Sequence, residues 1–225
     1  MSAEKSPIAV ALFDMDRTLV RTHTANLYTR YQRDIGELGR FDLLRTGWWM
    51  FQYSVGLVDA ERVALQVLDG YRGKTSAWLT ERCDKWFAEY VKSEISREGR
   101  ERVEHHRARG HVVAIATSAV SYAALPLARE LDIPHVVCSE LAVADGKLTG
   151  EIIPPLCYAA GKRERAETFV RSLGYELAQA AFYTDSITDL ALLEAVGHPI
   201  VINPDVRLRR VAMQRRWPIE EWRTV

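Results

Sequence analysis

Residues 8–19, IAVALFDMDRTL, join a continuous apolar run to a short acidic loop. The run at residues 8–13 has no polar member, which is typical of a strand buried on both faces of a parallel sheet. The loop begins with Asp14 and carries a second carboxylate at Asp16. This stretch predicts a central strand whose carboxyl end presents acidic side chains.

Four further apolar runs predict buried strands, at residues 111–116, 134–138, 180–183 and 199–202. Helical patterns alternate with them, at residues 119–131, 162–173, 190–196 and 206–215. This alternation predicts an α/β fold with a doubly wound, mostly parallel sheet. Residues 141–152 break the order, because Asp145-Gly146 between two alternating segments predicts a β-hairpin.

The segment between residues 20 and 98 contains helical patterns and no convincing buried strand. The patterns cover residues 25–35, 59–71 and 76–93. A helical domain inserted after the first strand accounts for both observations, with linkers near residues 20–22 and 94–98. We therefore expect a discontinuous core of residues 1–20 and 98–225 and a helical cap of residues 21–97.

Composition narrows the class of protein. The 30 basic and 30 acidic side chains of the 225 residues cancel, so nucleic-acid binding is not expected and any phosphate recognition must be local. The spacing of Cys83, Cys138 and Cys157 fits neither a zinc site nor a disulfide framework, which predicts reduced thiols. We expect no signal peptide and no transmembrane segment, because no apolar run approaches roughly 20 residues. A cytoplasmic protein follows, and the sequence does not indicate whether it forms a homo-oligomer.

Two acidic clusters follow predicted strands. Asp14 and Asp16 come after the first strand, and Asp185 and Asp189 come after the strand at residues 180–183. Ligands of a doubly wound sheet bind beyond the carboxyl ends of its strands, so the clusters are expected to converge. Neighbouring carboxylates repel one another unless a cation shares their site, and magnesium prefers oxygen ligands. The clusters predict a magnesium and phosphate site; the alternative is that each Asp only caps a helix.

Two further places supply groups that suit a phosphate. Lys162 follows Gly161 at the start of a helical pattern, and Thr117 follows the strand at residues 111–116 and precedes Ser118. A lysine balances phosphate charge as a mobile point charge, and a hydroxyl with nearby backbone N–H groups holds a phosphoryl oxygen. The alternatives are a solvated surface lysine and an ordinary helix N-cap.

Together these places resemble the motifs of the haloacid dehalogenase (HAD) superfamily of phosphotransferases. The first motif reads Asp14-Met15-Asp16-Arg17-Thr18-Leu19, the second-motif hydroxyl is Thr117, the third-motif lysine is Lys162, and the fourth motif reads Asp185-Ser186-Ile187-Thr188-Asp189. The subgroup that looks most similar, subfamily IB, contains the phosphoserine phosphatases. The resemblance covers residues 1–20 and 98–218, and it implies a Rossmann-like core with an inserted helical cap of the C1 type.

The resemblance also implies a mechanism. Asp14 attacks phosphorus and becomes an aspartyl-phosphate, while Asp16 is acid to the leaving alcohol and then base to the water. Magnesium is held by Asp14, the backbone carbonyl of Asp16, and Asp185. Asp189 orients either a metal-bound water or Lys162.

By the same resemblance, Lys162 and Thr117 balance charge on the phosphoryl oxygens, together with N–H groups of the loops. The implied phosphate and substrate site is completed by five more residues, namely Met15, Arg17, Thr18, Ser118 and His23. Arg17 stands where the family often has Gly, Asn or Ser, and it either adds positive charge near the cap or lies in solvent.

Three differences from phosphoserine phosphatases bear on the substrate. His23 stands where those enzymes usually carry a Glu for the substrate ammonium group, and Leu65 stands near the place of a cap arginine that holds the serine carboxylate. Their second motif is usually Ser-Gly-Gly, and here it is Thr117-Ser118-Ala119. These differences argue against phosphoserine as the main substrate.

We predict a magnesium-dependent phosphatase that acts on a small phosphorylated metabolite. One alternative is a phosphotransferase that passes the same aspartyl-phosphate to another alcohol. The other is a non-catalytic binding protein on the same fold, against which the intact acidic and lysine set argues.

Three surface and cap features have two interpretations each. Residues 47–58, GWWMFQYSVGLV, form either the core of the cap or the wall of a pocket or interface for an apolar group. His23, Asn26 and Tyr28 are candidates for contact with the leaving group, and each is equally a helix-start residue. A basic run near the C-terminus predicts a solvated helix face, made of Arg207, Arg209 and Arg210.

Overall fold

The structure, a computed structural model of the chain, describes residues 7–37 and 70–222. Within them lies a seven-stranded sheet in the order β4-β3-β2-β1-β5-β6-β7. The strands are β1 (Val10–Phe13), β2 (Val112–Val120), β3 (His135–Ala144), β4 (Lys147–Ile153), β5 (Ala180–Thr184), β6 (His198–Ile202) and β7 (Ile219–Glu220). Among these strands β4 alone pairs antiparallel, with β3. The predicted doubly wound parallel sheet is confirmed.

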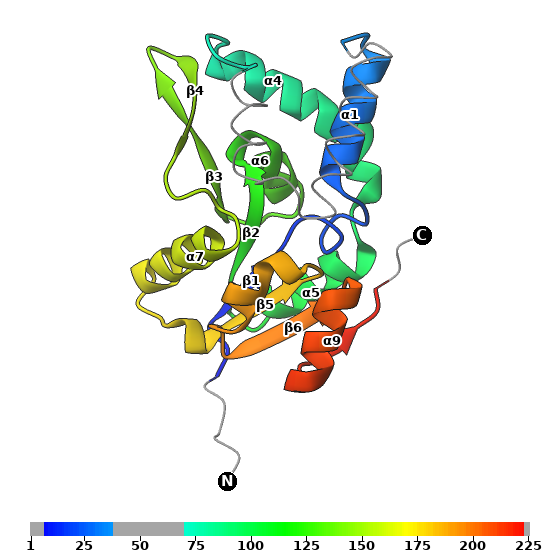
Figure 1. Cartoon of the computed structure of the whole chain (residues 1–225), viewed down its shortest axis with the longest axis vertical. Helices are drawn as coiled ribbons and strands as arrows, with labels where there is room; N and C mark the ends of the chain where they lie inside the picture. The colour runs from blue at the N-terminus through cyan, green and yellow to red at the C-terminus, as the bar shows by residue number, and fades with distance from the viewer. Residues whose placement is uncertain (1–6, 38–69, 223–225) are drawn as a thin grey trace.

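Helices cover both faces of the sheet (Figure 1). The core helices are α5 (Arg97–Arg107), α6 (Ser121–Glu130), α7 (Ala160–Ser172), α8 (Leu190–Leu193) and α9 (Val206–Arg215), with 3-10 turns at Leu177–Gln179 and Ile187–Asp189. Phe13 of β1 belongs to the same buried cluster as Val103 of α5 and Leu127 of α6. Leu12 points to the opposite face and shares a cluster with Ala166 of α7. The unbroken apolar run of β1 is thus explained by burial on both sides.

Two cap helices, α1 (Thr24–Asp34) and α4 (Ser76–Trp86), lie beyond the carboxyl ends of the strands (Figure 1). After α4 the chain forms a π-helical turn, Phe87–Val91, and a 3-10 turn, Lys92–Glu94. The predicted helices at residues 25–35 and 76–93 correspond to these elements. The helix predicted at residues 59–71, the aromatic segment at residues 47–58 and Leu65 lie outside the described residues, apart from positions 70 and 71.

The two connections between the cap helices and the core run side by side. The backbone N–H of Arg21 donates to the carbonyl of Glu94 at 2.8 Å, and the N–H of Ser96 donates to the carbonyl of Leu19 at 2.8 Å. Both linkers predicted from the sequence fall at this pair of segments. The division into a core of residues 1–20 and 98–225 and a cap of residues 21–97 stays a prediction.

The hairpin formed by β3 and β4 makes a third connection. Its turn is Asp145-Gly146, both with positive φ as this turn requires, and the predicted hairpin is confirmed. Leu141 and Leu148 of the hairpin share a buried cluster with Leu79 and Cys83 of α4. The backbones also bond just before α4, where the N–H of Leu148 donates to the carbonyl of Lys74 at 2.9 Å. A core hairpin therefore packs against a cap helix.

Some element boundaries differ from the sequence predictions. Strand β2 continues to Val120, with an irregular register between Ala116 and Val120, so α6 begins at Ser121 and not at residue 119. Helix α8 ends at Leu193 and not at residue 196. The described cysteines are unpaired and buried, as predicted from their spacing. The predicted basic face of α9 is solvent-exposed.

The sequence patterns did not predict α5. Its sequence, REGRERVEHHR, is mostly charged, and the residues that it buries are Gly99, Val103 and His106. These positions have helical spacing, but only one of them is a large apolar residue. A hydrophobic pattern is therefore barely visible, although the buried stripe is present.

His106 is a buried polar residue beneath the sheet. It is 3 % exposed, its Nε2 lies 2.8 Å from the hydroxyl of Tyr183, and its Nδ1 lies 2.8 Å from Nδ1 of His111. Burial, with repulsion from the neighbouring His111, lowers the pKa of His106 from 6.5 to about 4. The folded protein therefore keeps this ring neutral under mildly acidic conditions.

We expect the free energy of unfolding to fall between pH 6.5 and about pH 4 because of His106. In that interval the unfolded chain binds a proton that the folded chain does not, so acidification favours unfolding, by about 2 kcal/mol. Urea unfolding at a series of pH values measures the effect, and His106→Asn is the control. An unchanged pH dependence in His106→Asn would contradict this account.

Candidate active site

The carboxyl ends of β1 and β5 lie at the same level of the sheet, beside residues 115 and 116 of β2, and bring the predicted motifs together. Phe13 of β1 pairs with Ile115 of β2 and with Tyr183 of β5. The backbone N–H of Asp14 donates to the carbonyl of Tyr183 at 2.8 Å, which joins the acidic loop to the end of β5. The chain leaves β1 toward β2 and later returns to the other side of β1 with β5, so the strand order reverses there. This reversal is where ligands of such sheets bind.

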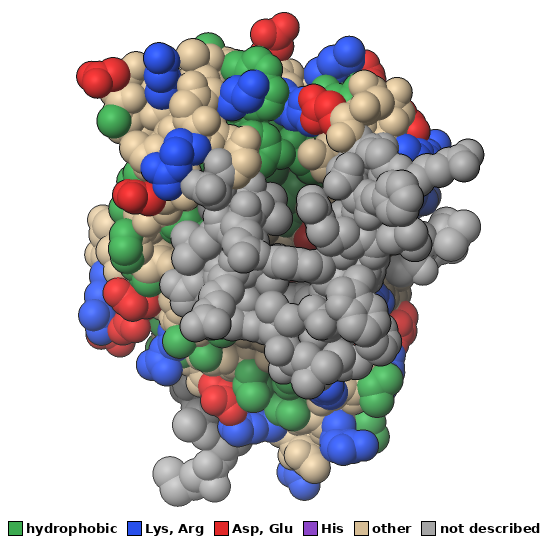
Figure 2. All heavy atoms as spheres, turned by 45° about the horizontal axis from the view of Figure 1, so that its top comes forward, with side chains coloured by type: hydrophobic (Ala, Val, Ile, Leu, Met, Phe, Trp, Pro, Cys, Tyr) green, Lys and Arg blue, Asp and Glu red, His purple; other side chains and the backbone are tan. Residues whose placement is uncertain are grey.

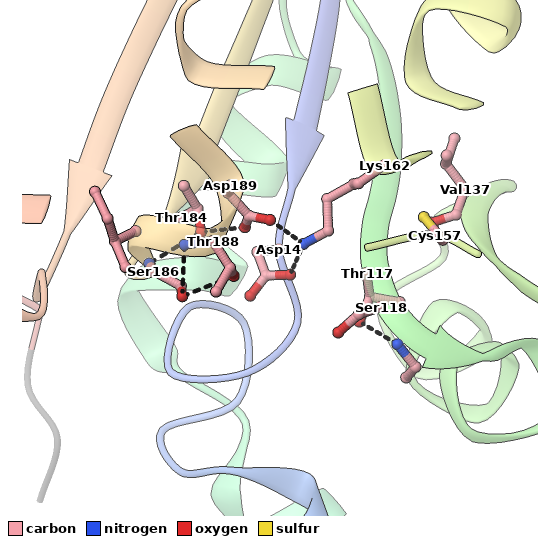
Figure 3. A network of polar contacts seen from close by, with 12 residues as sticks. Asp14, Thr117, Ser118, Val137, Cys157, Lys162, Thr184, Ser186, Thr188 and Asp189 are labelled. Carbon is pink, nitrogen blue, oxygen red and sulfur yellow. Dashed lines mark hydrogen bonds and ion pairs between the residues drawn. The ribbon is translucent and has the colours of Figure 1, made fainter. Parts of the chain in front are cut away.

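Lys162 lies at the centre of the site (Figure 3). Its Nζ donates to Asp14 Oδ1 at 2.9 Å and forms an ion pair with Asp189 Oδ1 at 2.7 Å. Asp14 lies in the loop after β1, Lys162 lies in α7, and Asp189 lies at the end of the loop after β5. Their exposed fractions are 6, 3 and 1 %, in the same order. The alternative of a solvated surface lysine is therefore wrong.

Both carboxylate oxygens of Asp189 have partners within the protein. Its Oδ1 faces Lys162, and its Oδ2 accepts a hydrogen bond from the hydroxyl of Thr184 at 2.6 Å. Of the two roles that the resemblance implied, this geometry favours the orientation of Lys162 over the orientation of a metal-bound water.

Burial and mutual repulsion destabilise the charged form of the site's carboxylates. Burial raises the pKa of Asp14 to about 7, Lys162 opposes this rise, and Asp189 and Asp16 add to it by repulsion. Burial and repulsion from Asp14 raise the pKa of Asp185 to about 8, although Arg17 opposes the rise. Burial alone would lower the pKa of Lys162, but its two acidic partners raise it. The site contains more negative charge than its lysine neutralises.

This donor set fits magnesium. Within residues 7–37 and 70–222, no group of three or more His, Cys, Asp and Glu side chains forms a ready metal cage. Magnesium does not need one, since it commonly uses one or two carboxylates together with phosphate and water oxygens. The two carboxylates with raised pKa values, Asp14 and Asp185, are the groups that a divalent cation would stabilise in their charged form.

Asp16 joins the acidic loop to the cap. Its Oδ1 accepts a hydrogen bond from the backbone N–H of Thr24, the first residue of α1, at 2.9 Å. His23 is the N-cap residue of α1 by position, but its exposed side chain makes no capping bond. Asp16 therefore caps the helix from the loop, and the helix N-terminus stabilises its negative charge. The capping alternative is correct for Asp16, and it is compatible with a catalytic role.

Arg17 does not simply lie in solvent. Its backbone adopts the left-handed conformation, with φ 53°, in the loop after β1. Its Nε lies 3.5 Å from Asp185 Oδ2, and its Nη2 donates to the carbonyl of Asn203 at 3.4 Å. The side chain is 34 % exposed, so the guanidinium group borders the acidic cluster and still contacts solvent.

The other predicted residues differ in what they can offer a phosphate. The side chains of Met15 and Thr18 are buried, at 0 and 1 % exposed, so only their backbone groups are available. Thr117 is buried, and its hydroxyl accepts a hydrogen bond from the N–H of Ala119 at 3.2 Å. It lies inside β2 and does not cap α6, whose N-cap residue is Val120.

The remaining candidates lie at the surface or within the cap. Ser118 and Asn26 are exposed. The hydroxyl of Tyr28 lies 2.7 Å from that of Tyr71 and accepts a hydrogen bond from Arg82 at 2.7 Å. Tyr28 is therefore part of a polar network within the cap. Figure 2 shows the same molecule with its upper end turned forward, and among the described residues of this face positive and negative side chains are interspersed.

Gly161 allows α7 to start close to the preceding loop. A Cβ atom at this position would lie 2.0 Å from the carbonyl oxygen of Leu156, which backbone atoms cannot tolerate. We expect Gly161→Ala to displace the first turn of α7, and with it Lys162. An error of about 1 Å in the position of a catalytic group costs on the order of 100-fold in activity.

Gly197→Ala is the matched control, because its Cβ would lie 1.9 Å from the carbonyl oxygen of Ala178, away from the site. Activity is to be compared with thermal stability for both variants. Equal losses of activity at equal losses of stability would show that Gly161 has no particular relation to Lys162.

Thr184 is a site residue that the sequence did not indicate. It ends the apolar run of β5, directly before Asp185, and is fully buried. The available signal was a polar residue between a buried strand and an acidic motif.

Comparisons with known proteins agree with the predicted fold and with the predicted enzyme class. The chain is 28 % identical over 227 residues to a phosphoserine phosphatase of Mycobacterium tuberculosis, covering 96 % of this chain and 71 % of that one. It is 26 % identical over 215 residues to a histidinol-phosphatase of Neisseria meningitidis, covering 93 and 97 %. A crystal structure of a protein of unknown function from Bordetella pertussis superposes with a TM-score of 0.86 at 26 % identity, covering 95 and 98 %.

No helix in the described parts of the chain is long and apolar enough to span a bilayer.

The model of the family described as haloacid dehalogenase-like hydrolase matches residues 11–194, which include all four predicted motifs. The predicted enzyme class, a HAD-like phosphatase, agrees with the names of both relatives. The chain therefore belongs to the haloacid dehalogenase-like hydrolases.

Proposed function

We propose that the chain hydrolyses the phosphate monoester of a small metabolite, with magnesium and through an aspartyl-phosphate on Asp14. The observation that carries the proposal is the position of the Lys162 ammonium group, 2.9 Å from Asp14 and 2.7 Å from Asp189. A buried, preorganised cation beside a carboxylate nucleophile reduces its repulsion toward a phosphate dianion.

In the proposed reaction, a carboxylate oxygen of Asp14 forms a bond to phosphorus while the bond to the leaving oxygen breaks. Asp16 donates a proton to that leaving oxygen, and it later accepts a proton from the water that cleaves the aspartyl-phosphate. The hydrogen bond from Thr24 holds Asp16 at the start of α1, between the nucleophile and the cap. Lys162 and the hydroxyl of Thr117 face the phosphoryl oxygens from the other side.

Asp14, Asp185 and the backbone carbonyl of Asp16 would hold the magnesium ion. When bound, the ion supplies positive charge that screens the carboxylates from the phosphoryl group. Asp189 is assigned to Lys162 in this proposal, because both of its oxygens already have partners.

The substrate is proposed to be a small phosphorylated metabolite other than phosphoserine. The two relatives carry different substrate names, phosphoserine and histidinol phosphate, at nearly equal identity. An ammonium group of phosphoserine needs a carboxylate partner, whereas the corresponding position here is the exposed His23. A cytoplasmic location remains part of this proposal.

The test measures phosphate release from p-nitrophenyl phosphate with magnesium, with EDTA, and with magnesium restored. We expect release that EDTA abolishes and magnesium recovers. A screen of phosphoserine, histidinol phosphate and lysophosphatidate then compares kcat/KM. Absence of magnesium-dependent release would refute the proposal, and phosphoserine as the best substrate would refute its specificity. Transfer to an added alcohol in excess of phosphate release would favour the phosphotransferase.

A further inference from the structure

Thr184 holds the far end of a buried chain of polar contacts. Its side chain is fully buried, and its hydroxyl donates to Asp189 Oδ2 at 2.6 Å. The same hydroxyl oxygen accepts a hydrogen bond from the backbone N–H of Ser186 at 3.3 Å. A hydroxyl has one proton, so accepting from Ser186 leaves that proton directed at Asp189.

The chain of contacts continues from Asp189 to the proposed nucleophile. Asp189 Oδ1 lies 2.7 Å from Lys162 Nζ, and Lys162 Nζ lies 2.9 Å from Asp14 Oδ1. Each of these residues is at most 6 % exposed, so solvent has little access to replace a missing partner. Figure 3 shows these contacts as dashed lines that join Thr184 to Asp189, and both Asp189 and Asp14 to Lys162.

The orientation of the Asp189 carboxylate needs a fixed partner. The last torsion of an aspartate is broad, so one ion pair does not determine the plane of the carboxylate. A second hydrogen bond, to the opposite carboxylate oxygen, determines that plane. Thr184 is suited to supply it, because it is the last residue of β5, a strand paired on both sides by β1 and β6. A group on a rigid central strand positions its partner more accurately than one on a loop.

We propose that Thr184 is a positioning residue, which fixes Asp189 so that Lys162 is held against Asp14 and the phosphoryl group. The inference rests on the proposed phosphatase function and adds a residue to it. Without the hydroxyl, Asp189 keeps its charge but loses its orientation. Lys162 then has more than one arrangement, and only some of them place its ammonium group correctly.

The experiment compares pairs of variants that differ in the hydroxyl group. Thr184→Val replaces the hydroxyl with a methyl group of similar size, and Thr184→Ser keeps the hydroxyl. We expect kcat to fall about 10- to 100-fold in Thr184→Val, the usual effect of losing an outer partner, with KM changed less than about 3-fold. Thr184→Ser is expected to stay within about 5-fold of the wild type.

A matched control and a second pair separate positioning from folding. Thr149→Val makes the same exchange in β4, where the hydroxyl donates to the carbonyl of Ala142, and its kcat is expected to be unchanged. If Thr184→Val does not fold, Thr184→Ala against Thr184→Ser tests the same hydroxyl, since both lack the methyl group. The inhibition constant of orthovanadate, a mimic of the transferring phosphoryl group, is expected to rise with the loss of kcat.

A double-mutant comparison identifies the path of the effect. In an Asp189→Asn background, replacing Thr184 by Val is expected to change kcat less than about 3-fold, because the partner is already altered. Equal effects in both backgrounds would overturn the proposal, as would a Thr184→Ser variant that is as slow as Thr184→Ala. A wild type without phosphatase activity would instead refute the proposed function, so the two failures are distinguishable.

Discussion

Asp14→Asn is expected to abolish phosphate release, with a loss of roughly 10⁴-fold or more. An amide is not a nucleophile toward phosphorus under these conditions, and the other groups of the site only position and stabilise. The exchange is nearly isosteric, so the surrounding structure has no steric reason to change. It also removes one of the carboxylates around Lys162 and leaves the Lys162–Asp189 ion pair in place. We therefore expect the free energy of unfolding to stay equal or to rise.

Two measurements check this result. Initial rates of phosphate release are compared with those of Asp132→Asn, an exposed position where no loss is expected. Acid-quenched mass spectrometry of the Asp14 peptide detects the aspartyl-phosphate in the wild type during turnover. Residual activity near the wild-type rate would remove Asp14 as the nucleophile.

Lys162→Met is expected to lower both activity and stability. Loss of one preorganised cation from the site costs about 10²- to 10³-fold in kcat. Removal of one partner from a buried ion pair leaves charges without compensation, and here Asp14 and Asp189 both lose their contact. The free energy of unfolding is expected to fall by about 3–5 kcal/mol. The opposite directions expected for Asp14→Asn and Lys162→Met follow from a site with excess negative charge.

Urea unfolding at neutral pH measures the stability change of Lys162→Met. Lys147→Met, at an exposed position of β4, is the control for the loss of a lysine. An unfolding free energy equal to that of the wild type would show that the two carboxylates do not depend on Lys162. In that case the raised pKa values of the acidic groups would need another source of compensation.

The core of the fold was predictable because its central strands coincide with uninterrupted apolar runs in the sequence. Phe13 and Leu12 lie on opposite faces of β1, and both are buried. The strand therefore contains no polar residue, and its sequence cannot be mistaken for that of a loop. Helix α5 was not predictable in this way, since Gly99 and His106 occupy two of its buried positions. β7 was also missed, because Ile219–Glu220 is too short for a pattern.

The site was predictable where it depends on strand ends and not where it depends on contacts between side chains. Asp14 and Lys162 were identified from their positions after a strand and before a helix. The bond from Thr184 to Asp189 joins a strand to a short helical turn, and no spacing rule indicates it. The approach of Arg17 to Asp185 depends on a left-handed backbone at Arg17, which its residue type does not favour.

The packing of the β3–β4 hairpin against α4 has a mechanical consequence. A lid attached by two adjacent segments swings freely about them, whereas a lid that is also held at a distant point opens only if that point yields. Here that point is formed by Leu141 and Leu148 of the hairpin with Leu79 and Cys83 of the helix. Opening is a common slow step of turnover in enzymes with lids. In the proposed phosphatase, opening of the cap would require either that this apolar contact breaks or that α4 and the hairpin move together.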